Sequence, residues 1–493
     1  MKQRPNETRY ATMKVQINAK APLGTYSDPT KWQNSTLRYT PPEDFPSYLE
    51  SRVGQAEIMR VWVTLDEYWD YRTDTYYPDY EIGKARYPVT ELHYPYDWKN
   101  IVPAPSGTRF CGYLTSHAAH AKELLLNVRR LEREVSDGVI TYEQYEAIFE
   151  RAVEHCKALA PNVRYVECCN EVDLKSFGRL SAEEYCKIYL CAHRAVTRLN
   201  ERHGYEMPLE LGGFAIAEPL VHWDLVRDVM TILKQSEIGE CPMAFYSYHL
   251  YNVPASKRLF TDGKPEIASL GGVGKLRVIA EWHRQLLRDL SLPEKPVFLN
   301  ELGKASTTGV DGDSLHNAAG ILTYLIAWSD SEFDDVYFFP WCTFHNPILQ
   351  MSFTQFLLNE DGSYSATPNG LAVELLHSLK GTRLRAAVSQ CDGPDVPYRA
   401  LAVADGDVLN VLCINPTGET VACDLELFSL PDGTYRCEQL LCDRRFNNVV
   451  TGNGDGFLRV TSEAECSTVN GRLTRRCVLE KDAFVLFRIS PKS

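Results

Sequence analysis

The sequence predicts an α/β protein, a (β/α)8 TIM barrel with a C-terminal antiparallel β-sandwich domain. Over most of the chain, short apolar runs rich in β-branched and aromatic residues alternate with helical patterns, which is typical of a parallel sheet covered by helices. After about residue 385 the helical periodicity stops, and short alternating strands follow between Gly, Pro and Asp turns, as in a sandwich. We therefore expect the barrel at residues 1–385 and the sandwich at residues 386–493.

The elements can be placed in order along the chain. Barrel strands are expected at residues 12–18, 57–64, 100–105, 164–171, 209–214, 243–251, 295–301 and 336–341. Helices are expected at residues 44–53, 117–135, 141–160, 182–203, 219–234, 314–330 and 368–380, with another that begins near residue 270. Two helix starts carry a capping-box signature, Thr141 with Gln144 and Ser181 with Glu184. Sandwich strands are expected at residues 398–403, 408–414, 420–425, 434–440, 473–479 and 483–489.

Two strands of the predicted barrel end on the same pair of residues, Asn170-Glu171 and Asn300-Glu301. Active sites of barrels lie at the carboxyl ends of the strands, so a carboxylate there is a candidate acid or base. A single glutamate at a strand end is usually a surface or helix-capping residue, but the repetition of the pair favours chemistry. Two such carboxylates fit a retaining glycoside hydrolase, in which one acts as the acid and the other as the nucleophile, about 5–5.5 Å apart.

The segment at residues 170–177, Asn-Glu-Val-Asp-Leu-Lys-Ser-Phe, is followed by a helix that carries Tyr185 and Tyr189. This segment resembles the acid/base segment of glycoside hydrolase family 39, the β-xylosidase and α-L-iduronidase family of clan A, whose pattern is Asn-Glu-Pro-Asn-Leu. Residues 211–215 are similar to the family's fifth strand, and residues 248–251 are similar to its sixth, which carries a His-x-Tyr.

The resemblance runs in order from about residue 55 to about residue 385, and residues 357–362 look like the family's closing segment. It implies a retaining glycosidase in which Glu171 is the acid and then the base, and Glu301 is the nucleophile. Asn170 is then expected to hydrogen-bond the sugar 2-hydroxyl. The substrate that the resemblance suggests is a β-xyloside or a related pentoside or uronide, cut by an exo-acting enzyme.

Three residues depart from the family's pattern: Val172 stands in place of the Pro, Cys169 in place of the usual Trp, and Asn300 in place of the usual Thr. We expect these positions to line the sugar site, so the identity of the sugar does not follow from the resemblance. An endo-acting polysaccharide hydrolase of clan A and a non-catalytic carbohydrate-binding barrel stay open as alternatives. A metal hydrolase that uses His249, His345 and carboxylates is a third.

Five further residues are candidates for substrate binding: Asp66, Trp69, His249, Tyr251 and Trp341. The first two open a long loop crowded with aromatic residues, whose rings could stack on sugars, pack the loop onto the barrel or form a subunit contact. His249 and Tyr251 occupy alternate positions at a strand end and therefore share a face. For His249, a core histidine bonded to a backbone carbonyl is the alternative. Trp341 ends the eighth strand and could form a sugar platform.

Composition excludes several classes of partner. The net charge of −13 argues against nucleic acid, because neutralising phosphates needs clustered Lys and Arg. No stretch approaches the ~18 apolar residues of a membrane span. The 15 cysteines are odd in number and form no C-x-x-C pair, and the first residues lack an apolar signal segment. We therefore expect a reduced, cytoplasmic protein without metal or cofactor, although a secreted protein trimmed of its signal would look the same. Assembly with copies of the same chain is left open.

Overall fold

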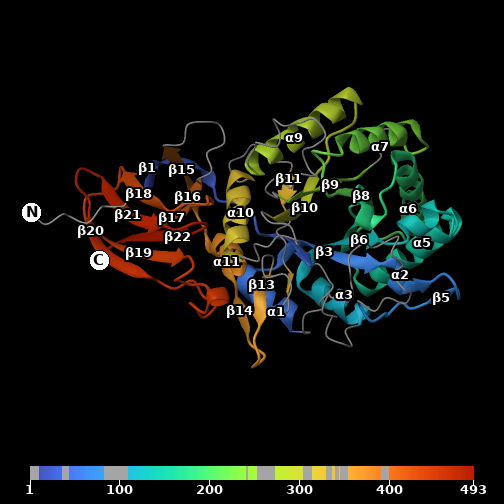
Figure 1. Ribbon diagram of the computed structural model, residues 1–493, viewed down its shortest axis with the longest axis horizontal. Coiled ribbons are helices and arrows are strands. Elements are labelled where there is room, and N and C mark those ends of the chain that lie inside the picture. The colour runs from blue at the N-terminus through green and yellow to red at the C-terminus, as the bar shows by residue number, and fades with distance from the viewer. Residues whose placement is uncertain are drawn as a thin grey trace, which may run out of the picture. The chain divides into compact units, whose positions relative to one another are not determined.

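Figure 1 shows the computed structural model of the chain. The structure describes residues 10–35, 44–82, 109–239, 243–251, 272–303, 314–328, 336–338, 343–344, 354–389 and 399–492. Two compact units make up the chain. The sandwich unit comprises Met1–Asp28, Asp311–Asp330 and Gln355–Ser493, and the barrel unit comprises Pro29–Val310 and Ser331–Thr354. The chain thus passes between the units several times, whereas the sequence suggested a single boundary after residue 385.

The barrel unit is built on a sheet of eight parallel strands (Figure 1). In order of pairing they are β2 (Trp32–Ser35), β3 (Ala56–Thr64), β6 (Ala121–Arg129), β7 (Val163–Cys168), β8 (Glu210–Ile216), β9 (Tyr246–Tyr251), β10 (Val297–Gly303) and β11 (Val336–Phe338). The last strand, β11, also contacts β2, so the sheet closes on itself. The TIM barrel is therefore confirmed, and the carboxyl ends of its strands meet at one rim.

Helices connect the strands of the barrel unit. They are α1 (Phe45–Val53), α2 (Leu65–Tyr68), α3 (Phe110–Ala119), α4 (Glu132–Ser136), α5 (Tyr142–Leu159), α6 (Ala182–His203), α7 (Trp223–Gln235) and α9 (Gly272–Asp289). Both predicted capping boxes are present, at the N-termini of α5 and α6. These two helices pack together, and arginines of α6 face glutamates of α5. Arg198, for example, reaches both Glu146 and Glu150.

The structure corrects the third βα unit. The predicted helix at residues 117–135 is wrong, because α3 ends at Ala119 and the strand β6 follows at once. The run Leu124-Leu125-Leu126 is completely buried, and a strand covered on both faces lacks the alternation that distinguishes it from a buried helix. The strand predicted at residues 100–105 lies outside the described residues, and β6 pairs with β3 in its place.

Residues 12–18 form a strand, as predicted, but this strand belongs to the sandwich unit and not to the barrel. This segment belongs to β1 (Ala11–Thr25), which pairs antiparallel with β15 (Thr382–Ser389) and parallel with β18 (Val421–Phe428) in the sandwich unit. The first strand of the barrel is instead β2. The burial of β1 explains the difference: alternate residues are buried, as in a sheet with one covered face, whereas strands of a parallel barrel are covered on both.

The sandwich unit holds a nine-stranded, mostly antiparallel sheet, which confirms the predicted second fold type. The strand order is β20-β19-β22-β17-β16-β15-β1-β18-β21. The remaining strands are β16 (Arg399–Asp405), β17 (Val408–Ile414), β19 (Thr434–Cys442), β20 (Ser462–Ser467), β21 (Leu473–Leu479) and β22 (Phe484–Pro491). The sequence missed β20, an edge strand whose polar residues are mostly exposed, since such a strand has no buried face to reveal it.

Two helices and a hairpin also belong to the sandwich unit: α10 (Ser314–Ala327), α11 (Pro368–Ser378), β13 (Thr354–Leu358) and β14 (Tyr364–Ala366). Most of its described cysteines, including Cys413, Cys423 and Cys437, are buried free thiols of the core, as expected for small apolar residues. Across the residues that the structure describes, no helix is both long and apolar enough to cross a membrane.

Candidate active site

Glu171 and Glu301 come together at the carboxyl end of the barrel. Glu171 follows β7 in a tight turn in which Cys169 and Glu171 take positive φ angles of 68° and 51°. Hydrogen bonds hold this turn to both neighbouring strands: the Cys169 amide donates to Val128 (2.9 Å) and the Glu171 amide to Ala215 (2.8 Å). Glu301 lies within β10. One oxygen of each carboxylate lies within 4.8 Å of the other, so both can contact one small group.

His249, on β9, lies between the two carboxylates. Its Nδ1 atom is 2.8 Å from Glu171 Oε1 and 3.3 Å from Glu301 Oε2, and its side chain is completely buried. The sequence placed His249 on the face of the strand that meets the site, and the structure brings it there. The alternative of a core histidine bonded to a backbone carbonyl does not describe its contacts, because its Nδ1 faces carboxylates.

Arg60, on β3, hydrogen-bonds residues at the carboxyl ends of both β7 and β10. The sequence did not predict this residue. Its guanidinium donates to Glu167 Oε2 through Nε (2.8 Å), to Glu301 Oε1 through Nη1 (2.8 Å) and to Asn170 Oδ1 through Nη2 (2.8 Å). The guanidinium is fully buried. The planar fork thus fixes the nucleophile candidate and the asparagine next to the acid candidate in one geometry.

Glu167, on β7, is the second residue that the sequence did not reveal. Besides Arg60, it accepts hydrogen bonds from Asn127 (2.7 Å) and from Asn300. Asn127 also donates to the Cys169 carbonyl (2.7 Å). This buried carboxylate is therefore paired with one cation and accepts hydrogen bonds from two side-chain amides. These partners offset the cost of burying its charge in the barrel interior. Its role is to hold the residues beneath the site.

Electrostatics distinguish the acid candidate from an ordinary glutamate. Burial raises the pKa of Glu171, and the charge of Glu301 adds to the rise, while the hydrogen bond with His249 opposes it. Burial lowers the pKa of His249, but the charge of Glu301 and the bond to Glu171 outweigh burial, so that this pKa is raised. The same rim carries Glu218, whose pKa is raised to about 7 by burial and by the charges of Asp173 and Glu171.

Two further predicted site residues, Asp66 and Trp69, lie in different surroundings. Asp66 lies in the first turn of α2, directly after β3. Burial raises the pKa of its carboxyl, although Arg130 and Arg129 act against the rise. Trp69 is buried in the small hairpin of β4 (Trp69–Asp70) and β5 (Thr75–Tyr76), and its indole donates to Asp74 (3.0 Å). The indole thus packs within this hairpin, and its contact with substrate stays a prediction.

The side chains of three predicted site residues, Tyr251, Trp341 and His345, lie outside the part of the chain that the structure describes. Tyr251 is the last residue of β9, but its side chain lies outside the described part of the structure. Trp341 and His345 lie outside the described residues altogether, as does the aromatic loop beyond residue 82.

A third feature of this rim was not predicted. Arg129, the last residue of β6, stacks its guanidinium 4.1 Å from the ring centre of Trp62 and 5.1 Å from that of Phe177. Trp62 lies on β3, two residues after Arg60, and therefore on the same face of that strand. A cation held between two rings is rigid.

A metal could in principle be held by Glu171, His249 and Glu301, since their ligand atoms all lie within 4.8 Å of one another. The 2.8 Å separation between His249 Nδ1 and Glu171 Oε1 is a hydrogen-bond distance. A hydrogen bond therefore accounts for the approach of His249 to Glu171, and His249 Nδ1 also lies 3.3 Å from Glu301 Oε2.

Comparison with known proteins identifies the fold. No family model and no curated protein matches the chain, but solved structures do. A monomeric β-xylosidase from Caulobacter crescentus is 16% identical, with a TM-score of 0.61 over 97% of this chain and 100% of that one. The GH39 enzyme from Xanthomonas axonopodis pv. citri is 14% identical, with a TM-score of 0.61 over 99% of each chain. This chain has the fold of the family 39 glycoside hydrolases.

Other solved structures with this fold include a glucosidase from Croceicoccus marinus, which is 17% identical with a TM-score of 0.59 over 98% of this chain and 100% of that one. These matches span nearly the whole of this chain, and therefore both the barrel unit and the sandwich unit.

Two departures from the family 39 pattern acquire a physical explanation. Asn300 was expected to line the sugar site, but its amide donates to Glu167 and its backbone carbonyl accepts from Asn34 (3.1 Å). Cys169 is fully buried, with its Sγ 3.6 Å from that of Cys168. Both positions therefore support the turn and the charge network beneath the carboxylates.

Proposed function

We propose that the protein is a retaining glycoside hydrolase in which Glu301 is the nucleophile and Glu171 the general acid and base. One observation carries the proposal: one carboxylate oxygen of Glu171 lies within 4.8 Å of one carboxylate oxygen of Glu301. Retaining enzymes hold their carboxyl groups about 5–5.5 Å apart, whereas inverting enzymes leave about 6.5–9.5 Å for a water molecule. The short distance between the nearest oxygens of Glu171 and Glu301 supports the retaining arrangement.

The surrounding contacts fit the two roles. Glu301 Oε1 accepts a hydrogen bond from Arg60 at 2.8 Å, whereas Oε2 lies 3.3 Å from His249 Nδ1. We therefore assign the attack on the anomeric carbon to Oε2. Glu171 donates its proton to the departing glycosidic oxygen as the bond to the anomeric carbon breaks. When Glu301 becomes an ester its charge disappears, the pKa of Glu171 falls, and Glu171 can then deprotonate the attacking water.

We propose an exo-acting enzyme on a β-xyloside or a related glycoside. The resemblance at residues 170–177 and 248–251 supports this class, and one structure of the same fold is described as a β-xylosidase. A small-molecule glycoside is also the simplest substrate for a site whose two carboxylates are almost completely buried.

A non-catalytic carbohydrate-binding barrel is the alternative. Burying an ionised carboxylate is costly unless it is paired, and a binder gains nothing from two such groups that face each other at short range. The presence of both Glu171 and Glu301, with Arg60 devoted to one of them, therefore favours catalysis.

A covalent trap tests the proposal. Protein treated with a matched 2-deoxy-2-fluoro β-glycoside should accumulate a glycosyl ester, and peptide mass spectrometry should locate it on Glu301. The Glu301→Gln variant should take up no label, whereas Glu218→Gln, which removes a carboxylate from the same rim, should be labelled normally. A label on any other residue would remove Glu301 from the role of nucleophile.

A further inference from the structure

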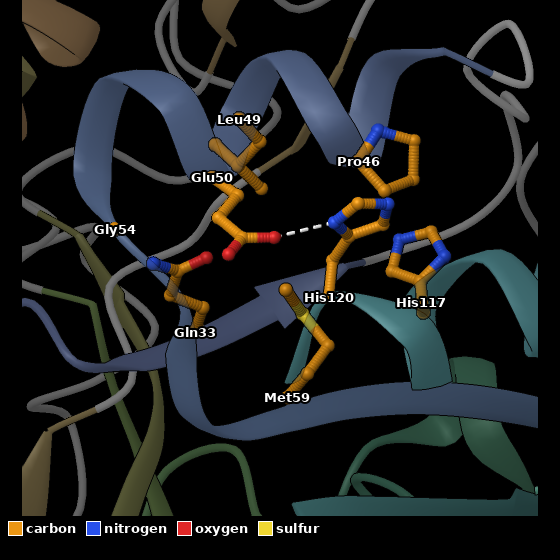
Figure 2. A pocket seen from close by; sticks show the side chains of 8 residues that line it. All are labelled: Gln33, Pro46, Leu49, Glu50, Gly54, Met59, His117 and His120. Atoms are coloured by element: carbon orange, nitrogen blue, oxygen red, sulfur yellow. Dashed lines mark hydrogen bonds and ion pairs between the residues drawn. The ribbon is translucent and has the colours of Figure 1, made fainter. Parts of the chain in front are cut away.

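A pocket lies away from the two glutamates, between α1, α3 and the strands β2 and β3. It is lined by Gln33, Pro46, Leu49, Glu50, Gly54, Met59, His117 and His120. Figure 2 shows its two histidine rings close to each other, with the Glu50 carboxylate on the far side of His120. His117 lies in the last turn of α3 and His120 caps this helix just before β6, while Glu50 lies in α1, which precedes β3. The pocket is therefore at the N-terminal ends of the strands, opposite the catalytic rim.

His117 has an unusual environment. Its side chain is only 2% exposed. Its Nδ1 atom lies 3.0 Å from the Tyr113 carbonyl, and a carbonyl can only accept, so Nδ1 carries the proton. In a neutral ring with the proton on Nδ1, the lone pair is on Nε2. No described residue gives this Nε2 atom a hydrogen bond, although a buried polar atom normally has a partner.

His120 presents the same chemistry. Its Nδ1 atom lies 2.5 Å from Glu50 Oε2, so that the carboxylate orients the ring and Nε2 is turned away from Glu50. Both histidine rings line the same pocket (Figure 2). The side chain of His120 is 30% exposed, so water can reach this end of the pocket.

These features are those of histidines that ligate a metal. Such histidines almost always donate their other ring N–H to a carboxylate or a backbone carbonyl, which fixes the tautomer and the ring orientation. His117 uses a carbonyl for this purpose and His120 uses Glu50. Neutral imidazoles suit zinc and related transition ions, which accept four ligands in a tetrahedron. Because His120 is partly exposed, water can supply the remaining positions.

We propose that His117 and His120 form a binding site for a divalent transition ion of the zinc type, oriented by Glu50. The ion would tie α1 to the end of α3 beneath the barrel. It would stabilise the barrel unit and take no part in the reaction at the opposite rim. This proposal is independent of the proposed function.

Zinc titration of metal-free protein tests the site. The Glu301→Gln variant serves as the parent, so that the cluster of Glu171, His249 and Glu301 cannot account for binding. Calorimetry should find one zinc ion per chain, and saturating zinc should raise the melting temperature. The His120→Asn substitution, at the partly exposed ligand, should weaken binding at least tenfold, and Glu50→Gln should weaken it less.

Activity gives an independent readout. In otherwise unsubstituted protein, His120→Asn should leave kcat and KM unchanged while it abolishes the zinc-dependent rise in melting temperature. If His117→Gln fails to fold, the zinc absorption edge of the parent still reports whether imidazole nitrogens surround the ion. The proposal is overturned if the parent binds no zinc, or if His120→Asn binds it as tightly as the parent.

Discussion

The Glu171→Ala variant should lose about 10²–10⁴-fold in kcat/KM on a glycoside with a poor leaving group, which is the range that general acid catalysis supplies. The loss should be much smaller on an activated aryl glycoside, whose leaving oxygen needs little protonation. Azide should restore turnover of the activated substrate, because it attacks the glycosyl ester without a general base, and a β-glycoside should then give a β-glycosyl azide.

The pH dependence of the unsubstituted protein follows from the pKa of Glu171, which burial and the charge of Glu301 raise. The protonated form of Glu171 is the active one, so kcat/KM of the unsubstituted protein should fall as the pH rises through that pKa. This basic limb should disappear in Glu171→Ala. Glu218→Gln is the matched control, because the pKa of Glu218 is raised to about 7 and it could otherwise cause the limb. A basic limb that vanishes in Glu218→Gln and persists in Glu171→Ala would show that the acid had been assigned to the wrong residue.

The Arg60→Met variant should lower the free energy of unfolding by about 3–5 kcal/mol, which is the usual cost of removing one partner of a buried ion pair. Arg60 and Glu167 have fully buried side chains, and Arg60 also holds Glu301 at 2.8 Å. Its loss leaves two buried carboxylates without their cation. Activity should fall as well, since Glu301 Oε1 and Asn170 both lose the donor that fixes them.

The double variant Arg60→Met/Glu167→Gln distinguishes two causes of the lost stability: an unpaired buried charge and lost packing. Removing Glu167 as well eliminates one unpaired charge, so the double variant should be more stable than Arg60→Met alone, and a double-mutant cycle should show strong coupling between the two residues. Urea unfolding of the four proteins measures both quantities. Additive losses, or a cost below about 1 kcal/mol for Arg60→Met, would mean that this network does not support the site.

Sequence reasoning located the carboxylates because the Asn-Glu pair occurs twice, at residues 170–171 and 300–301. It could not locate Arg60 or Glu167. Each is a single charged residue within an apolar strand, where it looks like the solvated position of an alternating pattern. Its partners are distant in sequence: Arg60 is separated from Glu167 by 107 residues and from Glu301 by 241. Only the closure of the barrel brings these residues together.

The sequence predicted the fold class correctly, and the elements that it predicted wrongly have physical causes. Helices α5 and α6 could be placed because each begins with a capping box and has a marked apolar face. The strand β6 was misread as part of a helix, since burial on both faces removes the period of two. The location of β1 depends on pairing with β15 and β18, hundreds of residues away, which local periodicity does not encode.

The configuration of the first sugar product tests the central claim most directly. Proton NMR during hydrolysis of an aryl β-glycoside detects the anomer that forms before mutarotation. Two displacements, first by Glu301 and then by water, invert the anomeric carbon twice, so the β-anomer should appear first. If the α-anomer appears first, the reaction inverts configuration, Glu301 forms no covalent intermediate, and the proposed roles of the two glutamates are wrong.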